Sequence, residues 1–70
     1  MKRMRLVKKA FEAVKHDKVP PESTQFKEGD KIVFLRREHG HTVFRFGTYG
    51  KFPEPYITSD EIFEANTEDY

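Results

Sequence analysis

Four consecutive apolar residues, Ile32 to Leu35, follow closely after the pair Gly29-Asp30. Glycine takes the positive φ that a tight turn requires, and aspartate can bond the local backbone. Alternate side chains of a β-strand point to opposite faces of a sheet, so a strand here is apolar on both faces. The run therefore predicts a turn that leads into a central strand.

A second β segment is expected over residues 42–52, TVFRFGTYGKF. Its alternation puts Phe44 and Phe46 on one face and Arg45 on the other. We interpret the two phenylalanines as core residues and Arg45 as the residue left to meet a ligand. The competing interpretation exposes both rings and makes the strand a surface on which bases stack.

Between these segments the chain reads His39-Gly40-His41. Two histidines on one strand face can share a metal ion, but zinc sites take three or four protein ligands. Nothing in the spacing supplies the others. We interpret the stretch as the tip of a hairpin in which Gly40 has a positive φ, and we expect neither a metal nor a cofactor.

Near the N-terminus, apolar residues recur at helical intervals. They are Met4, Val7, Phe11 and Val14. This stripe predicts an amphipathic helix with a basic outer face over residues 1–18. Pro20-Pro21 would end it, because proline lacks the amide proton and disfavours helix in the preceding residue. Residues 19–25 are then a linker.

The C-terminal part predicts a short strand, PYI, and a single helical turn over residues 58–65. Thr58 or Ser59 can cap that turn, with Glu61 at capping-box spacing from Thr58. Two apolar residues of the turn are expected to enter the core, Ile62 and Phe63. Residues 66–70 are expected to be a flexible acidic tail.

This order of elements suits a small sheet that is strongly curved. An apolar residue, a Gly-Asp turn and a strand open the segment 26–65, and a short strand, a helical turn and an apolar residue close it; the residues are Phe26, Gly29, Asp30, Ile32, Tyr56 and Ile62. With these residues, the segment resembles the SH3-like small β-barrel domains. The resemblance implies one mainly β domain, either a small SH3-like barrel or a strongly curved antiparallel sheet, with the N-terminal α-helix as an addition. The short, highly charged chain is also similar to the accessory proteins of phage and prophage genomes.

Charge is distributed unevenly along the 70 residues, although the net charge is only +1. Residues 1–18 carry a net charge of +5, residues 19–52 carry +2, and residues 53–70 carry −6. Such asymmetry indicates a basic contact surface, pairing between the two ends of the chain, or both.

The sequence speaks against an enzyme. It has no cysteine and no G-x-S-x-G or phosphate-loop motif. General acid–base catalysis needs a pocket, which so short a chain can hardly enclose. No apolar run is long enough to span a membrane, and charges interrupt the segment where a signal peptide would be apolar. We therefore expect a soluble, cytoplasmic protein with no small-molecule substrate.

A non-enzymatic binding module is the remaining class, and nucleic acid is the first hypothesis for its partner. Basic side chains would contact phosphates and tyrosines would stack or donate hydrogen bonds. The residues assigned to these roles are Arg5, Lys8, Lys9, Arg36, Arg37, Arg45, Lys51, Tyr49 and Tyr56.

The alternative is a protein-interaction module, such as a phage-type modulator of a host protein. It would present exposed aromatic residues and acidic side chains of the C-terminal segment to a basic partner. The acidic residues are Glu54, Asp60, Glu61 and Glu64. An exposed edge strand in so small a sheet also leaves dimerisation open.

Overall fold

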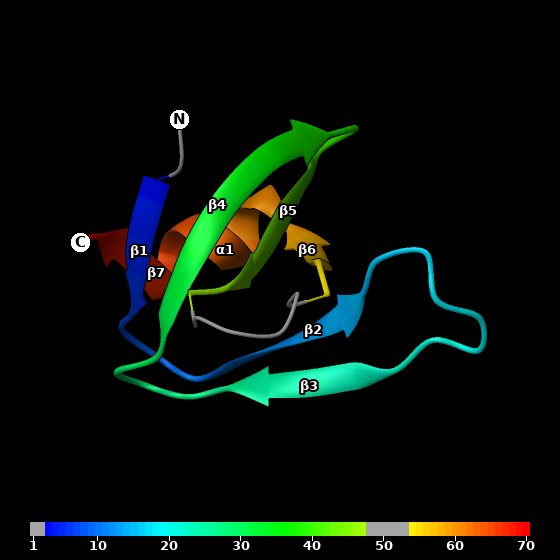
Figure 1. Ribbon diagram of the computed structural model, residues 1–70. Coiled ribbons are helices and arrows are strands. Elements are labelled where there is room, and N and C mark those ends of the chain that lie inside the picture. Colours follow the sequence, from blue (N-terminus) through cyan, green and yellow to red (C-terminus); the bar gives the residue numbers. More distant parts are fainter. Residues whose placement is uncertain (1–2, 48–53) are drawn as a thin grey trace.

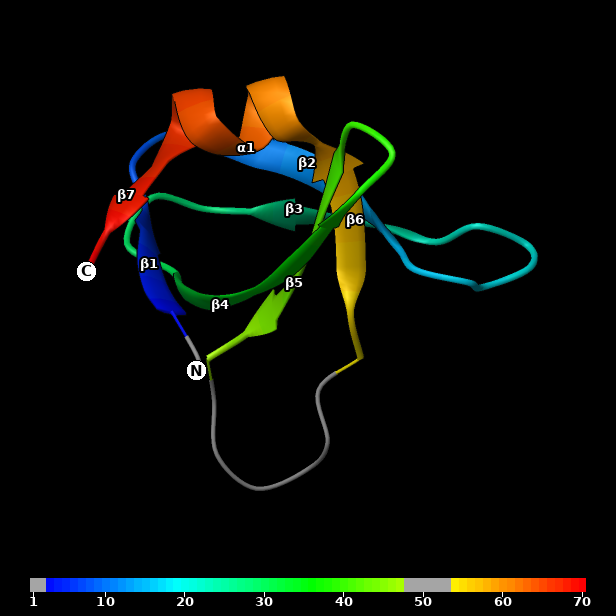
Figure 2. The same cartoon turned by 90° about the horizontal axis from the view of Figure 1, so that it is seen from above.

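Within the residues that the structure describes, 3–47 and 54–70, seven strands form one antiparallel sheet (Figures 1 and 2). This computed structural model shows the sheet curling into a half-barrel, with one short helix packed against its hollow side. The strand order is β3-β2-β6-β5-β4-β1-β7, so both ends of the chain enter the same sheet. The elements are β1 (Arg3–Val7), β2 (Phe11–Lys15), β3 (Ser23–Phe26), β4 (Lys31–Glu38), β5 (His41–Phe46), β6 (Tyr56–Ser59), α1 (Asp60–Asn66) and β7 (Thr67–Asp69).

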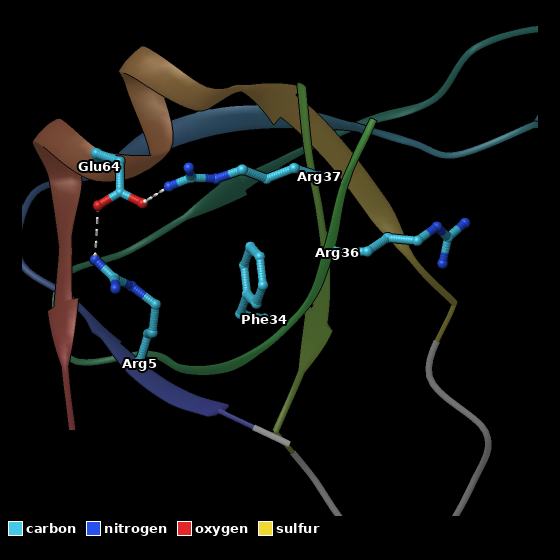
Figure 3. A pocket seen from close by; sticks show the side chains of 5 residues that line it. All are labelled: Arg5, Phe34, Arg36, Arg37 and Glu64. Carbon is cyan, nitrogen blue, oxygen red and sulfur yellow. Dashed lines mark hydrogen bonds and ion pairs between the residues drawn. The ribbon is translucent and has the colours of Figure 1, made fainter. Parts of the chain in front are cut away.

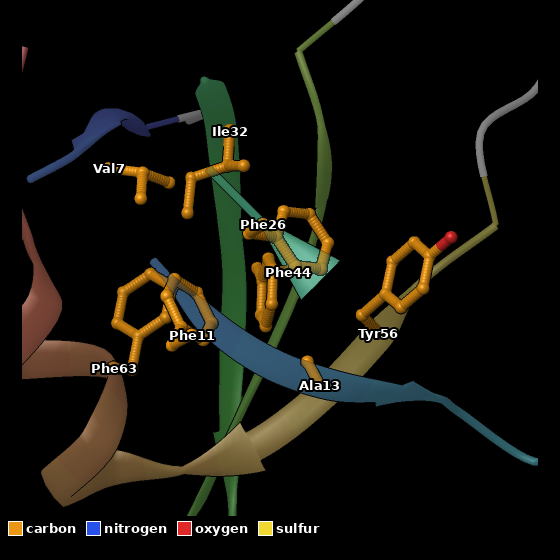
Figure 4. Packing of buried hydrophobic residues seen from close by; sticks show 8 residues of the cluster. All are labelled: Val7, Phe11, Ala13, Phe26, Ile32, Phe44, Tyr56 and Phe63. Atoms are coloured by element: carbon orange, nitrogen blue, oxygen red, sulfur yellow. The ribbon is translucent and has the colours of Figure 1, made fainter. Parts of the chain in front are cut away.

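An aromatic cluster fills the hollow side of the half-barrel (Figure 4). Phe26, the last residue of β3, is fully buried, and its ring centroid lies 5.4 Å from that of Phe11 and 5.1 Å from that of Phe44. The other buried members of the cluster are Val7, Ala13, Ile32, Tyr56 and Phe63. Burial of one phenylalanine stabilises a fold by about 1.5–3 kcal/mol, so this cluster is the main source of stability in a chain without disulfides.

The predicted central strand is confirmed as β4, which pairs with β1 on one side and β5 on the other. Ile32 is fully buried in the aromatic cluster, and Val33, whose side chain points to the opposite face, is only 2% exposed. The register between β4 and β5 shifts between Phe34 and Arg36, which marks a β-bulge. A bulge bends its strand and increases the twist of the sheet.

The hairpin between β4 and β5 also forms as the sequence predicts. His39 and Gly40 are its two turn residues, with φ of 49° and 79°. Two consecutive positive φ values are typical of the type I′ turn, whose twist matches that of the flanking strands. The strand that follows buries Phe44 completely, and Phe46 packs against the cluster. Both phenylalanines therefore belong to the core, and the base-stacking interpretation of this pair is wrong.

The helix predicted for the first 18 residues is wrong, because this segment forms β1 and β2. Along β2, Phe11 and Ala13 are buried while Glu12 and Val14 are exposed, which is the period of a strand. Helical spacing between Val7 and Phe11 is accidental, since a corner separates the two strands that carry them. β1 pairs with β4 and β2 pairs with β3. These pairings provide the hydrogen bonds that the backbone amide and carbonyl groups would otherwise have made within a helix.

Both segments predicted to be irregular contain a strand. β3 begins within the predicted linker of residues 19–25, and β7 lies within the predicted flexible tail of residues 66–70. β7 pairs with β1 in antiparallel register, and the backbone amide of Tyr70 donates to the carbonyl of Met4 at 3.2 Å. The two ends of the chain are therefore paired, which is one of the two outcomes that the charge asymmetry indicated.

The helical turn predicted near the C-terminus is α1. The hydroxyl of Ser59 caps it by accepting a hydrogen bond from the backbone amide of Ile62 at 3.1 Å. Phe63 is fully buried as expected. Ile62 is 43% exposed, so the prediction that its side chain enters the core is wrong. Consecutive residues of a helix point about 100° apart, and only one of the two can face the cluster.

The predicted fold class is thus confirmed as mainly β with a curled antiparallel sheet. Its one described helix lies near the C-terminus and not at the N-terminus. The sheet also includes residues before Phe26, because β1 and β2 are inner strands of it.

The neighbouring pair Ile62 and Phe63 gives a test of this packing. Phe63→Ala should lower the free energy of unfolding by about 3–5 kcal/mol, because it removes a buried ring and leaves a cavity. Ile62→Ala should lower it by less than about 1 kcal/mol, because that residue is 43% exposed and lies outside the core cluster. Urea unfolding of both variants measures the difference, and similar losses would contradict the orientation of α1.

Candidate functional site

A surface pocket opens where β1, β4 and α1 meet (Figure 3). Its volume is about 360 Å³. Five side chains line it, and three of them are arginines: Arg5, Phe34, Arg36, Arg37 and Glu64. The lining side chains therefore carry three positive charges and one negative charge.

The bulge in β4 decides which arginine faces the pocket. In a regular strand Phe34 and Arg36 would point to the same side. The extra residue shifts the alternation, so Arg37 points to the side of Phe34 and reaches toward α1, while Arg36 points away (Figure 3). The register agrees, because Arg37 is paired with the buried Thr42, whose hydroxyl donates to Asp60 of α1 at 2.6 Å.

Glu64 bridges the two arginines on either side of the pocket. Arg37 Nη2 donates to Glu64 Oε1 at 2.9 Å, and Arg5 Nη2 lies 3.4 Å from Oε2 of the same carboxylate. Arg37 comes from β4 and Arg5 from β1, so the carboxylate connects two strands through one helix residue. Phe34 lies between the two arginines in the view of Figure 3.

Arg5 is the most firmly held of the three arginines, with only 15% of its side chain exposed. Its Nε donates to the hydroxyl of Thr67 at 3.0 Å, and its Nη1 donates to Asp69 at 2.9 Å. Its guanidinium carbon lies 5.2 Å from the centroid of the Phe63 ring, which is cation–π distance. Arg5 thus docks β7 and α1 against β1 while it lines the pocket.

The two arginines of β4 are far more accessible: 52% of the Arg36 side chain and 58% of the Arg37 side chain are exposed. Arg36 Nε donates to Glu38 Oε1 at 2.6 Å. Glu38 Oε2 lies 3.2 Å from Nε2 of His16, the residue that follows β2. The hydrogen bond from Arg36, followed by the one from His16, lowers the pKa of Glu38 below its ordinary value of 4.5.

Three of the residues predicted to bind nucleic acid come together here, namely Arg5, Arg36 and Arg37. Lys8 and Lys9 are exposed on the corner between β1 and β2 and do not line the pocket. Arg45 is half-buried on β5, and its Nη1 donates to the carbonyl of Phe46 at 3.0 Å.

Tyr56 was predicted to stack on nucleic acid or donate a hydrogen bond to it, which needs an exposed ring, and the burial of Tyr56 shows that prediction to be wrong. It is only 7% exposed and belongs to the aromatic cluster, and its hydroxyl accepts a hydrogen bond from Thr24 at 3.2 Å. One polar partner is enough to satisfy a buried tyrosine hydroxyl. Two further predicted residues, Tyr49 and Lys51, lie outside the described residues.

The acidic residues proposed for a protein partner are mostly bound within the molecule. Glu54 lies 2.8 Å from Lys15, Asp60 accepts from Thr42, and Glu64 holds two arginines. Lys15 lowers the pKa of Glu54 through this hydrogen bond. Glu61 is exposed, as Glu54 and Glu64 are, but it forms no ion pair within the part of the chain that the structure describes.

Sequence reasoning missed the part played by Phe34 and the bridging position of Glu64. The apolar run Ile32 to Leu35 gave no sign that Phe34 would be partly exposed at the edge of the cluster. The pairing of Glu64 with Arg5 spans 59 residues and depends on the curl of the sheet. Only the opposite charges of the two chain ends gave a signal for it.

Two other surface hollows have similar volumes but different chemistry. One, of about 370 Å³, lies between β2 and β6 and has apolar walls formed in part by Val14 and Ile57. The other, of about 360 Å³, is lined by two lysines and two carboxylates, so the formal charges of these four side chains balance; they are Lys15, Lys18, Asp17 and Glu54. The arginine pocket stands apart from both through its surplus of hydrogen-bond donors.

Within residues 3–47 and 54–70, no group of three or more His, Cys, Asp or Glu side chains is arranged to hold a metal ion. In the same residues, no helix has the length and apolar character needed to cross a membrane. Comparison with protein-family models, with curated proteins and with solved structures finds no match. The chemistry of the pocket is therefore the guide to what the chain can bind.

The Glu38 carboxyl group offers a test of the contacts around Arg36. Because its pKa is lowered in the folded protein, Glu38 stabilises the fold above its unfolded pKa, and this contribution is lost as the pH falls through the folded value. Arg36→Gln should move the midpoint of the Glu38 titration upward toward 4.5, as followed by NMR of the carboxyl carbon. Arg37→Gln should leave it in place, because the ion pairs of Arg37 are to Asp60 and Glu64.

Proposed function

We propose that this protein is a non-enzymatic module that binds nucleic acid, with the arginine pocket taking one unpaired nucleotide. The observation that carries the proposal is one pocket that holds the partly exposed ring of Phe34 together with three arginines. Arg5 and Arg37 lie on either side of this ring, and Arg36 lies at the rim, where it points to the other side of β4. Guanidinium groups match the geometry of phosphate oxygens, and an aromatic ring offers a stacking surface to any base.

The accessibility of the arginines supports this role. More than half of the Arg36 and Arg37 side chains is exposed, so both can reach a strand that passes over β4. Because Arg36 points to the other side of β4 from Arg37, the pair can contact successive phosphates as the strand crosses. Arginine stays protonated in proteins and binds charge without transferring protons, so the proposal assigns the pocket no catalytic step.

The SH3-like resemblance belongs to this proposal. A small curled sheet gives such domains a rigid surface with short loops, and the half-barrel is compatible with that architecture. The role of a phage-type accessory protein stays a hypothesis about the biological process in which the module acts. Fold alone does not assign function, so the arginine pocket carries the proposal.

A protein-interaction module is less favoured, because its acidic residues do not gather at one described pocket. Glu54 lines the hollow that contains Lys15, Glu64 lines the arginine pocket, and Asp60 accepts a hydrogen bond from Thr42. The same experiment separates the two functions, since a protein-interaction module need not respond to oligonucleotides.

The test is a titration with oligothymidine of about eight nucleotides, followed by amide NMR shifts at two salt concentrations. Arg37→Gln should weaken binding about tenfold, since a hydrogen bond to a charged group contributes about 1.5–3 kcal/mol, and should reduce the salt dependence. Phe34→Leu keeps the apolar volume but removes the stacking surface, and a loss of about fivefold or more is expected.

Lys18→Gln is the matched control, because it removes the same charge from the connection between β2 and β3, outside the arginine pocket (Figure 1). Binding of this variant should weaken only slightly. No shifts for the unaltered protein at low salt would refute nucleic-acid binding, and equal losses for Lys18→Gln and Arg37→Gln would refute the assignment to this pocket.

A further inference from the structure

The Glu64 carboxylate occupies the most strongly donating part of the pocket. We infer that Glu64 holds the place of a phosphate group of the ligand, and that binding exchanges its carboxylate for that phosphate. The inference rests on the proposed function and adds to it an internal competitor, built into α1, that regulates the site.

The geometry of the contacts points to an anion with several oxygens. Arg37 and Arg5 approach the same carboxylate from two strands, and each contacts a different oxygen, at 2.9 Å and 3.4 Å. A phosphate group presents oxygens at a comparable separation and adds further acceptors. The third arginine, Arg36, can contact a neighbouring phosphate of the same strand once its hydrogen bond to Glu38 breaks.

Glu64 is able to leave. Its side chain is 47% exposed, and ion pairs at such positions contribute only about 0–1 kcal/mol each. It also lies in the last turn of α1, where the helix dipole disfavours a negative charge. The two arginines therefore hold Glu64 in place against the preference of its own helix, and a more highly charged anion can displace it.

Arg5 keeps its position in the arginine pocket when Glu64 leaves. Its Nε and Nη2 still donate to the side chain and the carbonyl of Thr67, and its Nη1 still pairs with Asp69. A phosphate that replaces the carboxylate meets a guanidinium that is already ordered. Preorganisation of this kind reduces the entropic cost of binding.

The exchange also gives the site selectivity. Because the ligand has to displace Glu64, its affinity depends on a difference between two free energies. One is the free energy with which its anion binds the arginines, and the other is that with which Glu64 binds them. Neutral groups and single carboxylates gain little from the exchange, whereas phosphates gain more through their charge and additional oxygens. We therefore assign the pocket to phosphate and not to carboxylate ligands.

The test compares two glutamates of the same helix. Glu64→Gln keeps the size of the side chain but removes the charge that competes with the ligand. Glu61→Gln makes the same change of net charge one turn away, at an exposed residue that does not line the pocket. Both variants are titrated with oligothymidine and, separately, with inorganic phosphate, following the Nε–H signals of the arginines.

Glu64→Gln should bind oligothymidine about fivefold more tightly than Glu61→Gln, which corresponds to one unit charge removed at about 4 Å in water. Inorganic phosphate should shift the Arg37 Nε–H signal at lower concentration in Glu64→Gln than in Glu61→Gln. Equal affinities of the two variants for both probes would overturn the exchange, even if the unaltered protein binds oligothymidine.

The two proposals fail in different ways. If none of the proteins binds oligothymidine while Glu64→Gln alone gains affinity for inorganic phosphate, the exchange is supported and the nucleic-acid function is refuted. The phosphate would then come from another ligand. If neither probe shifts the arginine signals in any variant, the exchange is overturned directly.

Discussion

Burial of Phe26 is the constraint on which the rest of the fold depends. This residue ends β3, an edge strand, yet its ring contacts four other aromatic rings with centroid distances of 4.7 to 5.4 Å. Two of these rings, Phe44 and Phe46, belong to β5, three strands away in the sheet. A flat sheet would hold them apart, so the sheet has to curl. With no disulfide and so few residues, the chain has few other means of stabilising that curl.

The pocket forms where this aromatic cluster ends. Phe34 lies at the edge of the cluster, 6.2 Å from Phe63, and Arg5 and Arg37 lie next to it in the pocket. Arg5 shares the hollow face with Val7 because the two are separated by one residue on β1. Arg37 reaches that face only through the bulge in β4. The same features that close the core therefore also assemble the donors of the site.

Local chemistry made part of this fold predictable. The run Ile32 to Leu35 gave the central strand, the pair His39-Gly40 gave the hairpin, and the hydroxyl before α1 gave the helix start. Each of these signals acts within a few residues. The N-terminal strands were missed for the opposite reason, because four apolar residues at helical intervals are also compatible with two short strands joined by a corner.

The residues of the site were also predictable only in part. Charge pattern alone selected Arg5, Arg36 and Arg37, but it also selected residues that the fold leaves elsewhere, such as Lys8 and Lys9. What distinguishes the first group is its position after folding. The bulge, the inward turn of Arg37 and the meeting of Arg5 with Glu64 all arise from contacts between distant strands, which periodicity along the chain does not record.

The uneven charge of the chain can be understood from these contacts. Part of the positive charge of the N-terminal segment is neutralised by the acidic C-terminal segment, through Arg5 with Glu64 and Asp69 and through Lys15 with Glu54. Arg36 and Arg37 come from the middle of the sequence, and their side chains remain more than half exposed despite their ion pairs. Folding therefore pairs the two ends of the chain and leaves two arginines from its middle accessible at the pocket, although each of them also has a carboxylate partner.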